Sequence, residues 1–506
     1  MDKLGRAAKN LKLTAISELV LALLKFFSRR MFVVFLGKEY LGISGLFTDI
    51  LSLLSLAELG VGVSITYSLY SPAAHGDTET VKSLMALYRR VYRGVGLVVL
   101  AAGLALTPFL DFFVKEMPEN IPHISLIYLL TVLNTGVSYF LSCKATLLFV
   151  QQRKYRDALI RAAVALLATA AQVTALWLTR SYLWYLAIAV CATLAQNILI
   201  SLETDRLNPY LREREVRPLP REKREEIRRN VKAMLLHRLG AAAVFGTDNI
   251  LISKFVGVAT TGLYSNYVMI RGFLNAVISS LFDAITPAMG NLNATEGEEE
   301  RRTAFRRLDF FSAWLFGWMS ICLFWLYDPF ISLWLGGGYL LPREVVFLIT
   351  VNFYVSSMRV PVSNVKGVMG LFWDDRYRSI AEAAVNLGVS ILLAERWGIA
   401  GILAGTLVST LALPAWIEPL VVYRRGLHLP VRTYFAGYLL RTAVTVAAGV
   451  ATGLLCRMTG EGFGGFCLKA LLCAAVPNGI YLAVYSGTEE LKFLQKEAAA
   501  LVRRIF

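Results

Sequence analysis

The sequence predicts an all-α, polytopic membrane protein with about fourteen transmembrane helices, arranged as two parallel-related six-helix lobes followed by two extra C-terminal helices. The first observation is composition: 56% of the 506 residues are hydrophobic and only 17% are charged, and the mean hydropathy is +0.55. Second, apolar runs of about 20 residues, long enough to cross a hydrocarbon core as helices, recur along the whole chain. Third, segments of the first half recur in the second half.

The apolar spans follow one another from the N-terminal segment to the C-terminal tail. The opening segment "MDKLGRAAKNLKL" leads directly into the first span without a small-residue cleavage site, so we expect no removable signal peptide. The fourteen spans are centred near residues 25, 56, 102, 132, 168, 190, 244, 275, 320, 355, 385, 410, 443 and 475.

The basic residues alternate between the connections. They precede the first span and follow the second and fourth, whereas "KEMPEN" after the third span has two acids to one base. Because cytoplasmic loops carry the excess of Lys and Arg, both termini are expected in the cytoplasm. The same bias explains the formal net charge of +16, so no nucleic-acid partner is expected. The mixed-charge run 212–232 is expected to be a cytoplasmic linker, either solvated or lying on anionic lipid head groups.

The cysteines and histidines give no sign of an enzyme or a metal site. The six cysteines lie in or beside apolar spans, and the four histidines are scattered along the chain. We therefore interpret the cysteines as small buried hydrophobic residues. No catalytic residue, metal or cofactor is predicted.

An internal repeat divides the chain. The stretch "FLGKEYLGISGLF" from Phe35 aligns with "FVGVATTGLYSNY" from Phe255 at a shift of 220, and "KATLLFVQQRKYR" aligns with "KGVMGLFWDDRYR" at a shift of 222. The alignments match Gly37 with Gly257, Gly42 with Gly262, Lys144 with Lys366, Tyr155 with Tyr377 and Arg156 with Arg378.

The repeat predicts the domain organisation. Each copy holds an even number of helices, so both copies start on the same side and should be related by an axis along the membrane normal, with a substrate cleft between them. The predicted parts are an N-terminal lobe at 1–202, a cytoplasmic basic linker at 203–232, a C-terminal lobe at 233–425, and two additional helices with a cytoplasmic tail at 426–506.

The first span carries an unusual stripe of charge. Glu18, Lys25 and Arg29 are spaced so that they share one helix face, and Arg30 lies beside it. A charge at the bilayer centre costs roughly 2.5 to 3.5 kcal/mol, so these side chains should face water or a partner charge. Alternatively, Arg30 snorkels to the membrane surface and Glu18 neutralises Lys25.

Further polar faces occur on the eighth, tenth and fourth spans. They predict a basic substrate cleft, although interhelical hydrogen bonds are an alternative explanation for polar residues in membrane helices. The predicted substrate-binding residues are Lys25, Arg29, Arg30, Lys144, Arg271, Asn275, Arg359 and Lys366. Intramembrane acids are fewer. Asp248 shares a helix face with His237, and the two residues form either a proton or cation site or a structural hydrogen bond. The candidates for cation coupling are Glu18, Glu58, His237 and Asp248.

The segments "FFSRRMFVVFLGKEYLGISGLFTDILSLLSLAELG" and "GTDNILISKFVGVATTGLYSNY" resemble oligosaccharide flippases of the O-antigen and capsule type. These flippases belong to the multidrug, oligosaccharidyl-lipid and polysaccharide exporter superfamily, and the resemblance covers residues from about 10 to 425. It implies two six-helix lobes around a V-shaped cavity. Basic residues of the first and eighth helices, here Lys25, Arg29, Arg30 and Arg271, would hold a diphosphate.

The resemblance also implies a function. Such a protein moves an undecaprenyl-diphosphate-linked oligosaccharide from the cytoplasmic to the outer leaflet of a bacterial plasma membrane by alternating access, coupled to a proton or sodium gradient. Its partners would be that lipid-linked glycan and membrane lipids, with other glycan-assembly proteins as further candidates. Two alternatives remain open: a drug or organic-cation exporter of the same superfamily, and a membrane glycan polymerase or ligase.

Overall fold

A computed structural model describes residues 3–55, 61–115, 118, 120–151, 153–213, 216–222, 225, 227, 247–371 and 374–505. These residues form α-helices with short 3₁₀ and π segments and contain no β-strand. The described chain divides into two compact units, Met1–Ser265 and Asn266–Phe506. The predicted lobe boundaries at 1–202 and 233–425 differ from this division and remain a prediction.

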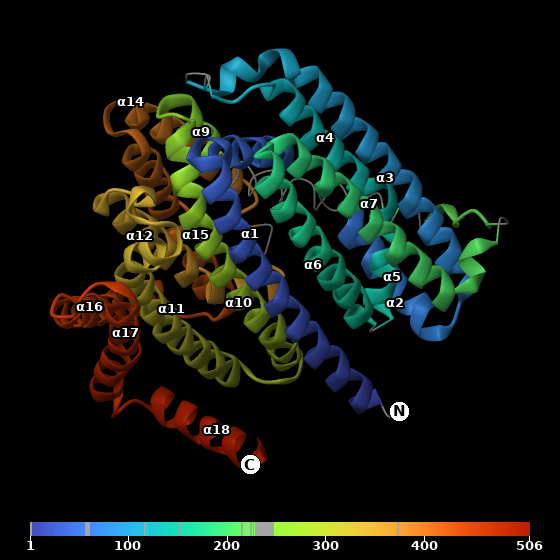
Figure 1. Cartoon of the computed structure of the whole chain (residues 1–506). Coiled ribbons are helices and arrows are strands. Elements are labelled where there is room, and N and C mark those ends of the chain that lie inside the picture. The colour runs from blue at the N-terminus through green and yellow to red at the C-terminus, as the bar shows by residue number, and fades with distance from the viewer. Residues whose placement is uncertain are drawn as a thin grey trace. The chain divides into compact units, whose positions relative to one another are not determined.

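In the first unit, a row of neighbouring helices runs in the order α1, α6, α7, α4 and α3 (Figure 1). The short helix α9 packs against α1. The bounds are α1 Lys3–Leu54, α2 Val61–His75, α3 Thr78–Leu106, α4 Ile124–Leu141, α5 Ala145–Val150, α6 Lys154–Thr179, α7 Tyr182–Leu207 and α9 Asp248–Phe255. Helix α10, Val258–Thr295, begins in this unit and continues into the second.

In the second unit, α11 is the central element. It contacts α12, α16 and α17, while α12 also packs against α14. The bounds are α11 Glu298–Leu335, α12 Arg343–Met358, α13 Val360–Val368, α14 Arg378–Ala412, α15 Pro414–Val421, α16 Val431–Cys456, α17 Gly462–Tyr485 and α18 Glu489–Ile505.

The predicted membrane class is confirmed by the length and apolarity of the helices. Among the described residues, nine helices are long and apolar enough to cross a membrane, or ten if the bent pair Ile124–Phe140 and Ser142–Val150 forms one span. Of the other predicted spans, the first falls on α1 and the one near 410 shares α14. The spans near 56 and 244 are centred within 56–60 and 228–246, which lie outside the described residues. The chain is therefore a polytopic α-helical membrane protein.

Two glycines divide long helices into separate spans. Gly37 interrupts α1 with φ 87° and ψ −175°, and Gly398 interrupts α14 with φ 55° and ψ −130°. A positive φ is readily available only to glycine, because other residues place a Cβ against the backbone there. The sequence predicted separate spans on either side of each glycine, and the two breaks account for them.

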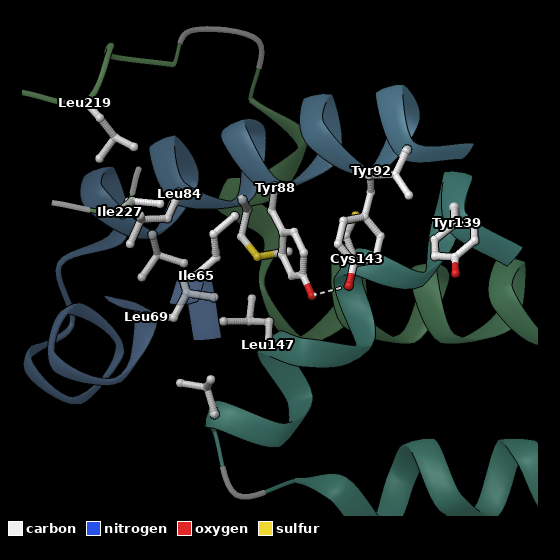
Figure 2. Close-up of a cluster of buried hydrophobic side chains, with 14 of the residues drawn as sticks. Ile65, Leu69, Leu84, Tyr88, Tyr92, Tyr139, Cys143, Leu147, Leu219 and Ile227 are labelled. Carbon is white, nitrogen blue, oxygen red and sulfur yellow. Dashed lines mark hydrogen bonds between the residues drawn. The ribbon is translucent and has the colours of Figure 1, made fainter. Parts of the chain in front are cut away.

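A buried cluster joins α2, α3, α4 and α5 of the first unit (Figure 2). The rings of Tyr88 and Tyr92 meet edge to face at 4.4 Å, and the Tyr88 hydroxyl donates to the Tyr92 hydroxyl over 3.1 Å. Leu219 and Ile227 of the basic linker belong to the same cluster. The described part of the linker therefore contributes apolar side chains to the core of this unit.

Charged groups hold the linker against the start of α3. Lys82 Nζ lies 2.6 Å from Glu213 Oε2, and the Ser83 hydroxyl donates to the carbonyl oxygen of Arg217 over 2.5 Å. Lys82 also contacts Glu79 of its own helix at 2.5 Å. These contacts, together with the buried Leu219 and Ile227, pack the described part of the linker against the first unit.

Candidate functional site

The charged stripe of α1 contains one anchored arginine and two exposed cations. Arg29 Nη2 donates to Ser265 Oγ over 2.5 Å, so the middle of α1 is tied to the beginning of α10. Lys25 and Arg30 are exposed, and neither forms a salt bridge with any residue that the structure describes. Glu18 is also exposed, and the described contacts include no ion pair between Glu18 and Lys25. The α1 cations thus differ in how firmly they are held.

An aromatic group from α7 lies beside Arg29. Phe32 contacts the rings of Tyr182 and Tyr185 at centroid distances of 5.2 and 5.3 Å. The hydroxyls of Ser28 and Tyr185 are 3.2 Å apart, and both tyrosines interact electrostatically with Arg29. No pattern in the sequence pointed to the two tyrosines, because they lie more than 150 residues from Arg29 along the chain.

The two repeat-matched segments cross each other through glycine. A Cβ added to Gly42 would lie 1.9 Å from the carbonyl oxygen of Val258, and a Cβ added to Gly262 would lie 2.1 Å from that of Lys38. Lys38 and Val258 are themselves matched by the shift of 220. The contact is therefore reciprocal, as expected where a two-fold axis relates two segments. This symmetry supports the internal duplication.

Two acids, the partly buried Asp49 and the buried Asp248, lie close to the same crossing. Asn249 Nδ2 donates to Asp49 Oδ2 over 2.8 Å, and the Tyr264 hydroxyl lies 3.3 Å from Asp248 Oδ2. Asp248 is 8% exposed. The arrangement joins α1, α9 and α10 through carboxylates with neutral donors, which suits a site that takes up a cation or a proton.

The remaining coupling candidates lie elsewhere. Glu58 and His237 fall outside the described residues, so the predicted pairing of His237 with Asp248 stays a prediction. No group of three or more His, Cys, Asp or Glu side chains within the described part of the chain is arranged to hold a metal ion.

Lys144, predicted to bind substrate, forms an ion pair within the first unit. Its Nζ lies 2.7 Å from Asp205 Oδ2, and the two side chains are 13% and 16% exposed. A second cation, Arg156, pairs with Glu203, which lies on α7 as Asp205 does. Both pairs connect the region around α5 and α6 with the end of α7.

Arg359 and Lys366 belong to a buried ionic network in the second unit. Arg359 contacts Glu382 at 3.3 Å and Glu418 at 3.2 Å, and Lys366 contacts Asp375 at 2.5 Å. Arg378 completes the network by contacting all three acids at 2.8 to 3.1 Å. The network balances three cations with three carboxylates across α13, α14, α15 and the turns beside them.

The two ionic groups are related by the internal repeat. Lys144 and Arg156 of the first unit match Lys366 and Arg378 of the second at the shift of 222. In each copy, the matched cations are neutralised by carboxylates rather than left open. The structure thus does not present Lys144, Arg359 and Lys366 as unpaired cations. Their predicted role in substrate binding remains untested.

Arg271 and Asn275 lie on the part of α10 that belongs to the second unit. Arg271 interacts electrostatically with Tyr327 of α11, and Asn275 is exposed. Beside them, the Tyr267 hydroxyl bonds to Asp328 Oδ1 over 3.0 Å and accepts from the Leu341 amide over 3.1 Å. This tyrosine network fixes α10 against α11.

The long, bent helices and the intramembrane charges define the chain as a membrane protein with the fold of flippases and exporters. The structure titled "Lipid II flippase MurJ, inward closed conformation" matches with a TM-score of 0.65 and 13% identity, over 94% of this chain and 99% of that one. An inward-facing multidrug resistance MATE family transporter of the MOP superfamily matches with a TM-score of 0.62 and 14% identity, over 82% and 98% of the two chains.

The sequence identifies the family. Residues 7–293, more than half of the chain, match the family described as "Polysaccharide biosynthesis protein", and the chain belongs to this family. No match was found among curated protein sequences. The resemblance predicted from the two segments of the first and seventh to eighth spans is thereby confirmed.

Proposed function

We propose that this protein is a flippase that moves an undecaprenyl-diphosphate-linked oligosaccharide from the cytoplasmic to the outer leaflet of a bacterial plasma membrane. Membership of the polysaccharide biosynthesis family supports a glycan substrate. The fold, shared with a lipid II flippase and with MATE transporters, supports movement of that substrate by alternating access. Both termini are cytoplasmic in this proposal.

The observation that carries the proposal is the state of the α1 cations. Lys25 and Arg30 are exposed and have no salt bridge within the described residues, and Arg29 is held between them by Ser265. Exposure of these charges to lipid would cost roughly 2.5 to 3.5 kcal/mol each at the membrane centre. An anionic diphosphate head group would remove that cost and form strong charge-assisted hydrogen bonds. Arg271 of α10 is proposed as a further diphosphate contact.

The experiment is a leaflet-accessibility assay in proteoliposomes that contain a polyprenyl-diphosphate sugar. We expect Lys25→Gln and Arg30→Gln to slow flipping, since each removes one contact to the diphosphate. Arg90→Gln is the matched control, because Arg90 is an exposed cation of α3 with no salt bridge within the described residues. Unchanged flipping by the Lys25→Gln and Arg30→Gln double variant would contradict the proposal.

A second candidate is an exporter of organic cations. It is favoured by one specific observation, the pair of acids Asp49 and Asp248 near the α1 crossing, together with the fold shared with multidrug transporters. The same proteoliposomes distinguish the two functions when loaded with a fluorescent lipophilic cation. Efflux that is lost in Asp248→Asn but retained in Lys25→Gln would favour this candidate.

A further inference from the structure

A cavity of about 400 Å³ lies in the second unit at one end of its C-terminal helices. It is lined by residues of α11, of α16 and α17, and of the segments that flank them. Helices α11 and α16 begin beside it and α17 ends beside it, and all three are candidate membrane spans. The cavity therefore lies at the depth where a membrane span meets the lipid head groups.

An ion pair with two unused polar atoms lines this cavity. Arg441 Nη2 donates to Asp309 Oδ2, and Asp309 is only 3% exposed. The other carboxylate oxygen, Asp309 Oδ1, and the Arg441 Nε have no hydrogen-bond partner within the described residues. Because a buried polar atom without a partner is unfavourable, the pair is suited to a ligand that both donates and accepts hydrogen bonds.

The charges and rings around the pair define the ligand further. The charged lining residues are Arg302, Arg306 and Arg441 together with Glu299, Asp309 and Glu490. Three cations and three acids leave no net charge, which disfavours a simple anion or a simple cation. Tyr434, Tyr485 and Phe310 add aromatic rings, whose faces attract an ammonium group. The lining therefore complements a zwitterion.

An apolar surface continues from the cavity along α16. Leu440 lines the cavity and is 61% exposed. Leu439 lies next to it, and Val446, Val450 and Leu454 follow along the same helix. All are exposed, at spacings that keep them on one side. A ligand with acyl chains could place its head group in the cavity and its chains on this surface.

We propose that this cavity binds the phosphoethanolamine head group of a membrane phospholipid. The primary ammonium group donates hydrogen bonds to Asp309 Oδ1 and lies near Glu490, while the phosphate accepts from Arg441 and from Arg306 at the mouth. The acyl chains lie on the exposed face of α16. The proposal concerns a resident lipid and is independent of the transported substrate.

The test is native mass spectrometry of the full-length protein in nanodiscs that contain phosphatidylethanolamine, phosphatidylglycerol and phosphatidylcholine in equal amounts. We expect phosphatidylethanolamine to be retained preferentially, because the quaternary ammonium of phosphatidylcholine has no proton to donate and phosphatidylglycerol has no ammonium. Arg306→Gln and Glu490→Gln should each weaken retention about tenfold. Arg432→Gln and Glu489→Gln are the matched controls, since neither residue lines the cavity and both are exposed.

Four results would overturn the proposal. Equal retention of phosphatidylcholine would show that no donated hydrogen bond reaches Asp309. Equal retention of phosphatidylglycerol would show that only the phosphate is recognised. Competition by water-soluble phosphoethanolamine at the same free concentration as the lipid would assign the site to a soluble ligand. Wild-type retention by both cavity variants, with their folding confirmed, would place the bound lipid elsewhere.

Discussion

Gly42 and Gly262 pack reciprocally, each against the backbone of the helix that carries the other. A Cβ at either position would lie about 2 Å from a carbonyl oxygen, at 1.9 Å for Gly42 and 2.1 Å for Gly262. Two helices can approach this closely only where neither has a side chain at the contact. The pair therefore holds the repeat-matched segments in one crossing.

Substitution of either glycine by alanine should destabilise the protein. Because backbone blocks each new methyl group, Gly42→Ala and Gly262→Ala are each expected to cost about 1 to 3 kcal/mol. The measurement is the free energy of unfolding in mixed detergent micelles. Gly94→Ala on α3 is the control, since a Cβ there meets no atom within 4 Å; it should leave stability unchanged or raise it slightly. Equal behaviour of all three variants would contradict the crossing.

The buried ionic network of the second unit predicts a strong asymmetry between single and double substitutions. Lys366 and Asp375 have side chains that are 7% and 3% exposed, so Asp375→Leu alone leaves excess buried positive charge and should cost about 3 to 5 kcal/mol. The double variant Lys366→Met with Asp375→Leu should recover most of that loss. Thermal unfolding in detergent measures both. No recovery in the double variant would mean that the pair does not act as a unit.

The Lys144 and Asp205 pair separates a structural role from a role in substrate binding. Lys144→Ala should impair folding, because the partly buried Asp205 then loses its cation. The charge-reversed double variant, Lys144→Asp with Asp205→Lys, should restore both stability and flipping if pairing is the main role of Lys144. Restored stability with lost flipping would instead assign Lys144 to the substrate, as the sequence predicted.

Arg29 should contribute through geometry as well as charge. Replacement by alanine removes a charge-assisted contact, and we expect a loss of about 1.5 to 3 kcal/mol, roughly ten- to hundredfold in affinity for the lipid-linked substrate. Arg29→Lys should retain partial activity, because it keeps the charge but loses the planar fork that matches phosphate oxygens. Ser265→Ala is the companion variant, since it removes one hydrogen-bond acceptor of Arg29 and leaves the guanidinium in place. Full flipping by Arg29→Ala would exclude Arg29 from the site.

Asp248 is expected to affect ion coupling more than substrate binding. Asp248→Asn keeps the size of the side chain and its contact with Tyr264 but removes the charge that a proton or sodium ion would neutralise. Flipping driven by an imposed gradient should fall, while binding of the lipid-linked substrate in detergent should stay near wild type. A proportional loss of binding would place Asp248 in the substrate site instead.

The sequence by itself determined the membrane class and most of the helical spans, and it showed the matched segments of the internal repeat. Apolar runs of membrane length require helices, because backbone groups in lipid must bond within their own segment. The match between Gly37 and Gly257 was equally visible in the sequence. In the structure, both glycines adopt positive φ values. These features depend on local sequence alone.

Only the tertiary structure decided which charges are paired. Lys25, Lys144 and Lys366 look alike as lysines in or beside apolar spans. Lys144 has a partly buried carboxylate partner and Lys366 a buried one, whereas Lys25 is exposed. The partner of Lys144 is 61 residues away. Pairing depends on which helices become neighbours, and no periodicity within one helix encodes its neighbours. The same reason hid the aromatic contacts of Arg29 and the cavity at Asp309, which form from segments that are distant in the chain.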